Sequence, residues 1–214
     1  MRVLNGLDLE SRLLTERVLV IAKIVKRAVQ LYKMNEYTKV VVAGGKTEGL
    51  LTAAVLKCLG IHEIFMITGN DTSLELAKLF GAKEVIHYHQ KGAIPQIQEK
   101  IRKCFGGKLG DVVFQFKPGN SINRLIEKNG CVCAMASVMS DRQDARYYDE
   151  TRPVVRRYYS VKEYEECFEI LDKAAQLKLP LYRLITHRYS LEEVNEAHWN
   201  AVCDQGLVVA VFNR

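Results

Sequence analysis

The sequence predicts an α/β fold in which helices cover both faces of a doubly wound parallel sheet. Three observations predict it. Short apolar runs alternate with amphipathic stretches along almost the whole chain of 214 residues. One run, residues 39–43, is a continuous β-branched segment, which is typical of a strand buried on both faces of a parallel sheet. Glycines follow several of the amphipathic stretches, where a helix commonly ends.

The first part of the chain predicts one long helix and then alternating strands and helices. Apolar side chains recur at three- and four-residue steps over residues 9–33, which predicts a helix with one buried face. Strands are expected at residues 39–43, 63–67, 84–87, 111–116 and 130–136. Helices are expected between them at residues 48–59, 72–80, 94–105 and 121–128.

The last part of the chain follows a polar segment, residues 140–153. We expect a strand at 154–159, a helix at 161–177, extended chain at 184–186, a helix at 191–203 and a strand at 207–212. Three helix starts carry the capping-box pattern, in which a hydroxyl and a carboxylate three residues later satisfy helix-start amides. They are Thr72 with Glu75, Ser160 with Glu163 and Ser190 with Glu193. The sequence predicts an N-terminal helical segment over 1–37 and one domain over 38–214.

Composition and charge narrow the function classes. The net charge of +6 comes from scattered lysines and arginines, so we expect no nucleic-acid surface. No stretch approaches the roughly 20 apolar residues of a membrane span. Six cysteines in apolar segments, with no signal-peptide pattern, predict reduced thiols and a cytoplasmic location.

No metal site is predicted from the cysteines and histidines. Cys131 and Cys133 have the wrong spacing for a zinc knuckle and are expected to be buried thiols. His87 and His89 lie two apart at a strand end, but no carboxylate or cysteine lies near them in the sequence.

A glycine-rich turn, residues 44–49, follows the first strand and precedes a helix. The dinucleotide fingerprint needs glycines at its first, third and sixth positions, and Gly44 and Gly49 occupy the first and sixth. Lys46 occupies the third position, where a side chain can block the phosphates. Gly45, Lys46 and Thr47 also look like the end of a P-loop, but the glycine that this motif needs is Val40 here, so a triphosphate site is not expected. The turn predicts a Rossmann-type nucleotide-binding domain over 38–214.

The second strand should end in an acidic residue that binds the adenosine ribose of NAD. Thr68 and Gly69 stand there instead, and no arginine replaces the acid to bind a 2′-phosphate. Asp71 is read as a turn residue. The choice between NAD and NADP therefore stays open.

At these positions the sequence resembles a known family, the medium-chain, zinc-type alcohol dehydrogenase-like dehydrogenases. The similar stretches are residues 40–88, 111–136, 184–201 and 205–212, and the most specific is LELAKLFGAKEVI. The resemblance covers the family's cofactor-binding domain, and it implies a role for each of several residues. Gly44, Gly45 and Gly49 would form the pyrophosphate turn, and Thr68 and Gly69 would face the ribose. Phe116, Lys117, Ala136 and Ser137 would lie near the ribose and nicotinamide.

The sequence also departs from this family. Besides Lys46, Ala210 stands where a basic residue often contacts the pyrophosphate. Only 38 residues precede the first apolar strand, they look helical, and no Gly-His-Glu motif is present. We therefore do not expect a self-sufficient zinc dehydrogenase, and the sequence assigns no catalytic residue.

These observations support two functional hypotheses. The first is an NAD(P)-binding domain or subunit of an alcohol dehydrogenase-like oxidoreductase, whose substrate pocket and any zinc come from a catalytic-domain partner. The second is a non-catalytic Rossmann-fold interaction or regulatory module with a degenerate cofactor site. A third possibility is that the chain binds another nucleotide-like ligand in the same crevice. Homodimerisation through an edge strand such as residues 154–159 is expected by analogy with the family.

Overall fold

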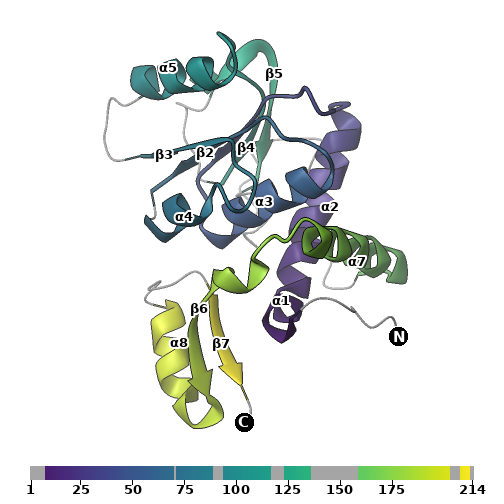
Figure 1. Cartoon of the computed structure of the whole chain (residues 1–214), viewed down its shortest axis with the longest axis vertical. Coiled ribbons are helices and arrows are strands. Elements are labelled where there is room, and N and C mark those ends of the chain that lie inside the picture. The colour runs from purple at the N-terminus through teal and green to yellow at the C-terminus, as the bar shows by residue number, and fades with distance from the viewer. Residues whose placement is uncertain are drawn as a thin grey trace, which may run out of the picture.

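A five-stranded parallel sheet forms the centre of the fold and confirms the predicted fold class. The computed structural model describes residues 8–69, 71–88, 94–116, 123–135, 159–202 and 208–212. The strand order is β3-β2-β1-β4-β5 (Figure 1). The chain moves outward from β1 through β2 to β3 and then returns to add β4 beside β1, so the direction reverses between β1 and β4. In open sheets of this kind, ligands bind at the carboxyl ends of the strands beside that reversal. The strands are β1 (Val40–Ala43), β2 (Ile64–Thr68), β3 (Glu84–His87), β4 (Gly110–Gln115) and β5 (Ile126–Ala134).

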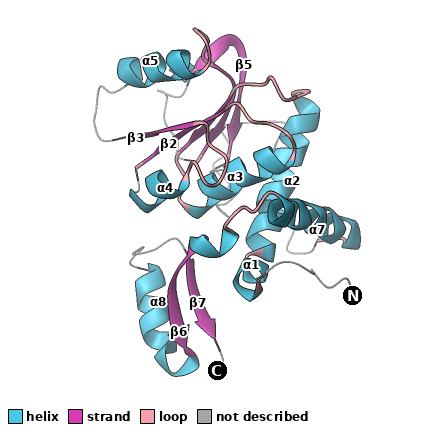
Figure 2. Cartoon of the chain, in the orientation of Figure 1, coloured by secondary structure: helices cyan, strands magenta, loops and turns pink. Residues whose placement is uncertain are grey.

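Helices cover both faces of this sheet, as Figures 1 and 2 show. The helix α5 lies on one face, and α2, α3 and α4 lie on the other. The helix α7 packs against α2 and α3. The helices are α1 (Leu9–Leu13), α2 (Thr15–Leu31), α3 (Thr47–Cys58), α4 (Asp71–Leu76), α5 (Ile94–Cys104), α7 (Val161–Gln176) and α8 (Val194–Val202). Within the described residues, none of them is both long and apolar enough to cross a bilayer.

Each central strand buries both of its faces, as the apolar run at residues 39–43 predicted. All four residues of β1 are buried, and they alternate between two clusters. Val40 and Val42 pack on the side of α2 and α3, whereas Val41 and Ala43 pack against the α5 side. This alternation follows from the two-residue period of a strand. The glycine turn is therefore attached to a strand that is buried along its whole length.

The predicted helix at residues 121–128 is wrong over its second half. The strand β5 already begins at Ile126, where it pairs with Gly110 of β4. The carbonyl of Leu125 accepts a hydrogen bond from the Gly110 amide at 3.1 Å, and the Glu127 carboxylate accepts one from the Leu109 amide at 2.6 Å. Short apolar segments do not distinguish a strand from a helix by periodicity, so tertiary pairing decides this one.

A second, two-stranded parallel sheet contains β6 (Ile185–Ser190) and β7 (Val208–Phe212), which the sequence did not separate from the first sheet. The helix α8 connects the two strands, and the 3-10 turns η2 (Leu181–Leu184) and η3 (Leu191–Glu193) flank β6.

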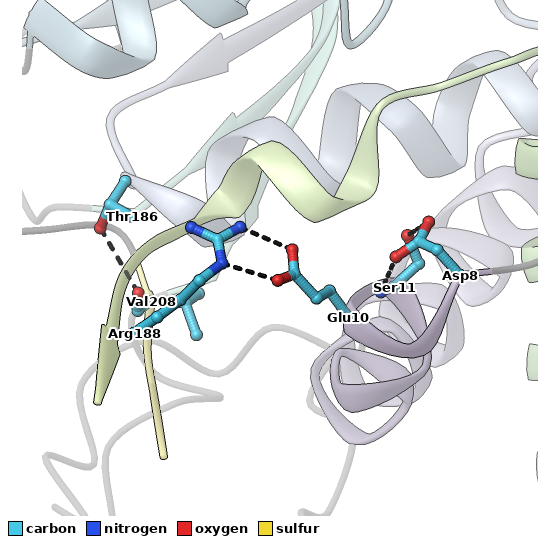
Figure 3. Close-up of polar contacts among 6 residues, drawn as sticks. All are labelled: Asp8, Glu10, Ser11, Thr186, Arg188 and Val208. Atoms are coloured by element: carbon cyan, nitrogen blue, oxygen red, sulfur yellow. Dashed lines mark hydrogen bonds and ion pairs between the residues drawn. The ribbon is translucent and has the colours of Figure 1, made fainter. Parts of the chain in front are cut away.

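Arg188 of β6 donates two hydrogen bonds to Glu10 of α1, at 2.6 and 2.5 Å (Figure 3). Asp8 caps α1 by accepting from the Ser11 amide at 2.7 Å, and Thr186 donates to the Val208 carbonyl at 3.4 Å (Figure 3). The ion pair joins this small sheet to α1. The division into 1–37 and 38–214 stays a prediction.

Two of the three predicted capping boxes are confirmed. Ser160 and Glu163 cap α7 reciprocally, and Ser190 and Glu193 do the same at η3. Thr72 does not act as a cap, because α4 begins one residue earlier, at Asp71. Residues 154–158 of the predicted strand at 154–159 lie outside the described residues.

Glu163 also connects α7 to α2. Its carboxylate lies 2.5 Å from the Lys23 ammonium and accepts a hydrogen bond from the Ser160 amide at 2.7 Å. The Lys23 ammonium, with this amide, lowers the pKa of Glu163 from 4.5 to about 2. A carboxylate with a lowered pKa stabilises the fold above its unfolded pKa, and this contribution is lost as the pH falls towards the folded value.

Replacing Glu163 with glutamine is expected to lower the free energy of unfolding at pH 7 by about 1 kcal/mol, because an ion pair and part of a cap are lost. The difference from the wild type should shrink as the pH falls from about 4.5 to about 2. Urea unfolding at pH 7 and pH 3 measures it. Glu165→Gln, an exposed change on the same helix, serves as the control and should have little effect. A difference that stays constant with pH would contradict the assignment.

Candidate functional site

The glycine turn after β1 has the backbone geometry of a tight strand-to-helix connection. Gly44 and Gly45 have φ values of 82° and 73°, in the left-handed region that favours glycine. The Gly44 amide donates to the carbonyl of Ile67 in β2 at 2.8 Å. A Cβ atom at Gly49 would lie 2.5 Å from the Gly44 carbonyl oxygen, so only glycine lets α3 start this close to the strand. Gly49 therefore plays the helix–strand packing role that the fingerprint assigns to its last glycine.

Phe116 lies against this turn. It follows β4, and its amide donates to the carbonyl of Ala43 at 3.0 Å. A Cβ atom at Gly45 would lie 2.7 Å from the Phe116 ring and 2.9 Å from the Gly49 amide nitrogen. The structure thus brings Gly45, Gly49 and Phe116 together at the reversal between β1 and β4.

Lys46, at the third position of the fingerprint, has an irregular backbone conformation. Its φ of −73° is ordinary, but its ψ of −95° lies outside the main helical and extended regions, and the residue is partly exposed. It directly precedes α3, whose first residue, Thr47, is only 1% exposed. That a side chain here can block the approach of the phosphates stays a prediction.

A carboxylate also lies in the first turn of α3. Glu48 accepts from the Arg17 guanidinium of α2 at 3.2 Å. The paired guanidinium offsets part of the negative charge of this carboxylate. Because the Arg17 side chain is 49% exposed, solvent weakens this pairing.

The end of β2 is the second region that the sequence singled out. Thr68 is buried, its carbonyl accepts from the Tyr88 amide at 2.7 Å, and Gly69 is exposed beside it. Thr68 pairs in register with His87 at the end of β3. The His87 Nε2 atom lies 3.2 Å from Asp71 Oδ1.

The sequence did not predict the contact between His87 and Asp71. The two residues are 16 positions apart, and His87 has no carboxylate near it in the sequence that would indicate the contact. Parallel register brings the ends of β2 and β3 to one edge of the sheet, so the residue that follows the β2 tip reaches the end of β3. The register of the two strands was the signal that could have indicated this contact.

Other residues that the sequence singled out contribute less. Lys117, Ala136 and Ser137 lie outside the described residues. Ala210 is 9% exposed and pairs in register with Arg188 in the second sheet. The described residues contain no group of three or more histidine, cysteine, aspartate or glutamate side chains that could hold a metal ion, so they do not provide a zinc site.

Two of the described cysteines, Cys58 and Cys167, have strongly raised pKa values. Burial raises the pKa of the Cys58 thiol to about 11 and that of Cys167 to about 12. Such thiols stay protonated at neutral pH and are poor nucleophiles. Cys133 is buried as expected, whereas Cys131 is only partly buried.

Comparison with known proteins identifies relatives that are longer than this chain. A family model described as zinc-binding dehydrogenase matches residues 49–163. Sorbitol dehydrogenase 1 from Saccharomyces cerevisiae is 25% identical over 181 residues, which are 80% of this chain and 50% of that protein. D-xylulose reductase from the same yeast is 25% identical over 178 residues, 78% of this chain and 48% of that protein. The chain spans about half the length of these relatives.

Solved structures share the fold. The alignment with an alcohol dehydrogenase from Thermotoga maritima has a TM-score of 0.75 at 19% identity and covers 100% of this chain and 60% of that one. An alcohol dehydrogenase from Thermus sp. ATN1 gives 0.70 at 20% identity, with 98% and 61% covered. The matched part is the cofactor-binding region of such dehydrogenases, which confirms the resemblance expected from the sequence. Because the family model matches more than half of its 214 residues, the chain belongs to the zinc-binding dehydrogenase family.

Proposed function

We propose that this chain is the NAD(P)-binding part of an alcohol dehydrogenase-like oxidoreductase. One observation carries the proposal. The turn after β1 has two glycines in the left-handed region and a third, Gly49, whose Cβ position is filled by the Gly44 carbonyl oxygen. A dinucleotide pyrophosphate requires backbone this close and this compact at the start of a helix. The residues present at the turn fit that group.

The residues around the turn would divide the cofactor among them. Backbone amides from Gly45 to Gly49 would donate to the pyrophosphate, and the Lys46 ammonium would add a positive charge beside it. The ring of Phe116 would limit the crevice on the β4 side. In the strand order, β2 and β3 lie on the opposite side of β1 from β4, and the adenosine would extend towards their ends.

The nicotinamide would lie towards the carboxyl ends of β4 and β5, near Lys117, Ala136 and Ser137. When bound, the cofactor supplies the hydride chemistry, and the protein orients it. A catalytic-domain partner chain or further domain would supply the substrate pocket and any zinc, because the described residues hold no candidate metal cluster. The relatives carry about as much chain again outside the matched region.

The proposal can be tested by isothermal titration of the chain with NADH, NADPH, NAD and NADP at low ionic strength. We expect saturable binding of at least one of them. ATP is the matched control, because it has phosphates and adenine, but the turn is too short to surround a triphosphate. We therefore expect no binding of ATP. Absence of binding for all four dinucleotides would overturn the proposal.

The second candidate is a non-catalytic interaction or regulatory module, and two observations favour it. Lys46 replaces a fingerprint glycine, and Ala210 carries no charge where the family often has a basic residue. A chain that binds no dinucleotide but retains a protein partner in a pull-down would support this function. Cofactor-dependent oxidation of a polyol by the chain with a partner would exclude it.

Homodimerisation is proposed by analogy with the family, through an edge strand in the region of residues 154–159. Sedimentation at tens of micromolar protein tests it, and a single monomeric species would contradict it. A cytoplasmic location is proposed from the reduced thiols of Cys58, Cys104 and Cys167, and a fluorescent fusion seen outside the cytoplasm would contradict that proposal.

A further inference from the structure

The small sheet and α8 form a unit with few contacts to the rest of the described chain. The helix α8 and the strands β6 and β7 pack mainly against one another and against η3, and Figure 1 shows them apart from the five-stranded sheet. Asn200 of α8 donates to the Tyr189 hydroxyl at 2.5 Å, so α8 covers the face that carries Tyr189 and, in register, Val211. The opposite face carries Arg188 and Ala210, and it is turned towards α1. What holds this second face in place therefore decides where the unit lies.

An ion pair fastens that face to α1. The Arg188 guanidinium donates through Nε and Nη2 to the two carboxylate oxygens of Glu10, at 2.6 and 2.5 Å, which is the bidentate geometry of a strong arginine–carboxylate pair (Figure 3). The two residues are 178 positions apart in the chain. The Arg188 side chain is 44% exposed and that of Glu10 is 27% exposed, so dissolved ions reach the pair. Ala210, beside Arg188, is only 9% exposed, and the pair therefore closes the sheet over an apolar position.

The helix α1 presents Glu10 from a fixed place on the main body of the fold. A helix of five residues does not persist by itself in water. This one is fixed at its start by Asp8, whose carboxylate accepts from the Ser11 amide and from the Ser11 hydroxyl, each at 2.7 Å. At its end, Leu14 is buried and leads directly into α2, which packs on the five-stranded sheet. The Glu10 carboxylate is thus anchored to the main body, whereas Arg188 belongs to the small unit.

The base of β6 has the features of a joint. Ile185, its first residue, is buried in the main core next to Leu184 of η2. The register with β7 shifts between Ile185 and His187, so the regular pairing of the two strands is interrupted there. Irregularities of this kind bend a strand. A small change of the backbone angles at Thr186 would therefore turn the rest of the unit relative to Ile185.

We propose that Glu10 and Arg188 form a salt-sensitive latch, which holds the small unit closed and lets it turn about the base of β6 when the pair is broken. In the closed state the pair covers Ala210. In the open state the face that carries Arg188 and Ala210 is accessible to solvent. The screening length of salt falls from about 10 Å at 0.1 M to about 3 Å at 1 M, so high salt weakens an exposed pair. The position of the small unit is thus set by a charge contact that ionic strength controls.

The rate at which a maleimide modifies the thiol introduced by Ala210→Cys measures the opening. Mass spectrometry of the peptide that contains position 210 separates this thiol from the native cysteines. Adding Glu10→Gln to Ala210→Cys should make the reaction about fivefold faster, the ratio expected for the loss of one exposed ion pair. Raising the salt from about 0.1 M to about 1 M should quicken the reaction only where the latch is intact. Glu16→Gln, the same charge change at an exposed position of α2, is the control and should leave the rate unchanged.

A thiol introduced by Val211→Cys, on the other face of β7, shows whether the unit turns or unfolds. Val211 is already 39% exposed, so its rate of modification should not respond to Glu10→Gln. An equal rise at positions 210 and 211 would mean that the small sheet unfolds, and it would overturn the latch. A rate at position 210 that responds neither to Glu10→Gln nor to salt would also overturn it. Arg188→Gln added to Glu10→Gln should have no further effect, because the pair is already lost, and a further acceleration would contradict the pairing.

Hydrogen exchange tests the latch without an introduced thiol, so the test does not depend on the folding of Ala210→Cys. Arg188→Gln changes no residue of α1, but it should quicken amide exchange at residues 9–14 by about threefold, because the short helix loses a contact. Exchange within α3 should keep its wild-type rate. Unchanged exchange at residues 9–14 would overturn the latch.

Discussion

Replacing Gly49 with valine is expected to abolish dinucleotide binding and to lower the free energy of unfolding by about 3 kcal/mol, as overpacking of an enclosed site does. The Cβ position of Gly49 lies 2.5 Å from the Gly44 carbonyl oxygen and 3.1 Å from the Met66 methyl group. The carbonyl belongs to the backbone, so it cannot move aside without shifting the turn. Titration with NADH and unfolding in urea measure the two effects.

Gly60 provides the matched control for this substitution. It has a φ of 83°, but a Cβ atom there meets nothing within 4 Å. Gly60→Ala should cost about 1 kcal/mol from backbone strain alone and leave cofactor binding intact. Wild-type NADH affinity in Gly49→Val would contradict the account of the turn.

Replacing Phe65 with alanine is expected to lower the free energy of unfolding by about 4 kcal/mol, because the removed ring leaves a cavity in a closed core. Phe65 lies in β2 and is fully buried, in the cluster on the α5 side of the sheet. Its ring meets that of Phe105 edge to face, with centroids 6.3 Å apart. Urea unfolding measures the loss.

Phe65→Leu is the control, because it keeps most of the apolar volume and should cost clearly less than the alanine change. Equal losses for the two variants would show that the ring's packing, and not the cavity, dominates. A loss below about 1 kcal/mol for Phe65→Ala would mean that β2 is not enclosed as described.

Apolar pattern alone was enough to predict the central sheet. Residues 40–43 are apolar because β1 has neighbours on both edges and helices on both faces, so all four of their side chains are buried. The glycine turn was predictable for a related reason. At three positions the backbone needs a left-handed φ value or has no room for a side chain, and the sequence has glycine at each of them: Gly44, Gly45 and Gly49.

Other features depended on contacts between distant segments, which the sequence pattern does not contain. The start of β5 at Ile126 depends on pairing with Gly110, and the small sheet depends on pairing between β6 and β7. The contact of Asp71 with His87 depends on the register of β2 and β3. The irregular ψ of Lys46 was not predictable, because the fingerprint states which residue is preferred at a position and not which backbone conformation another residue adopts there.

Hydrogen exchange of the backbone amides, with and without saturating NADH, tests the central claim most directly. The account predicts slower exchange at residues 44–50, where the amides of the turn and of the first turn of α3 would bind the pyrophosphate. It predicts a smaller change at residues 68–71 and none at the start of α7. Binding of NADH with no protection at residues 44–50 would contradict the claim that the glycine turn after β1 is the dinucleotide site.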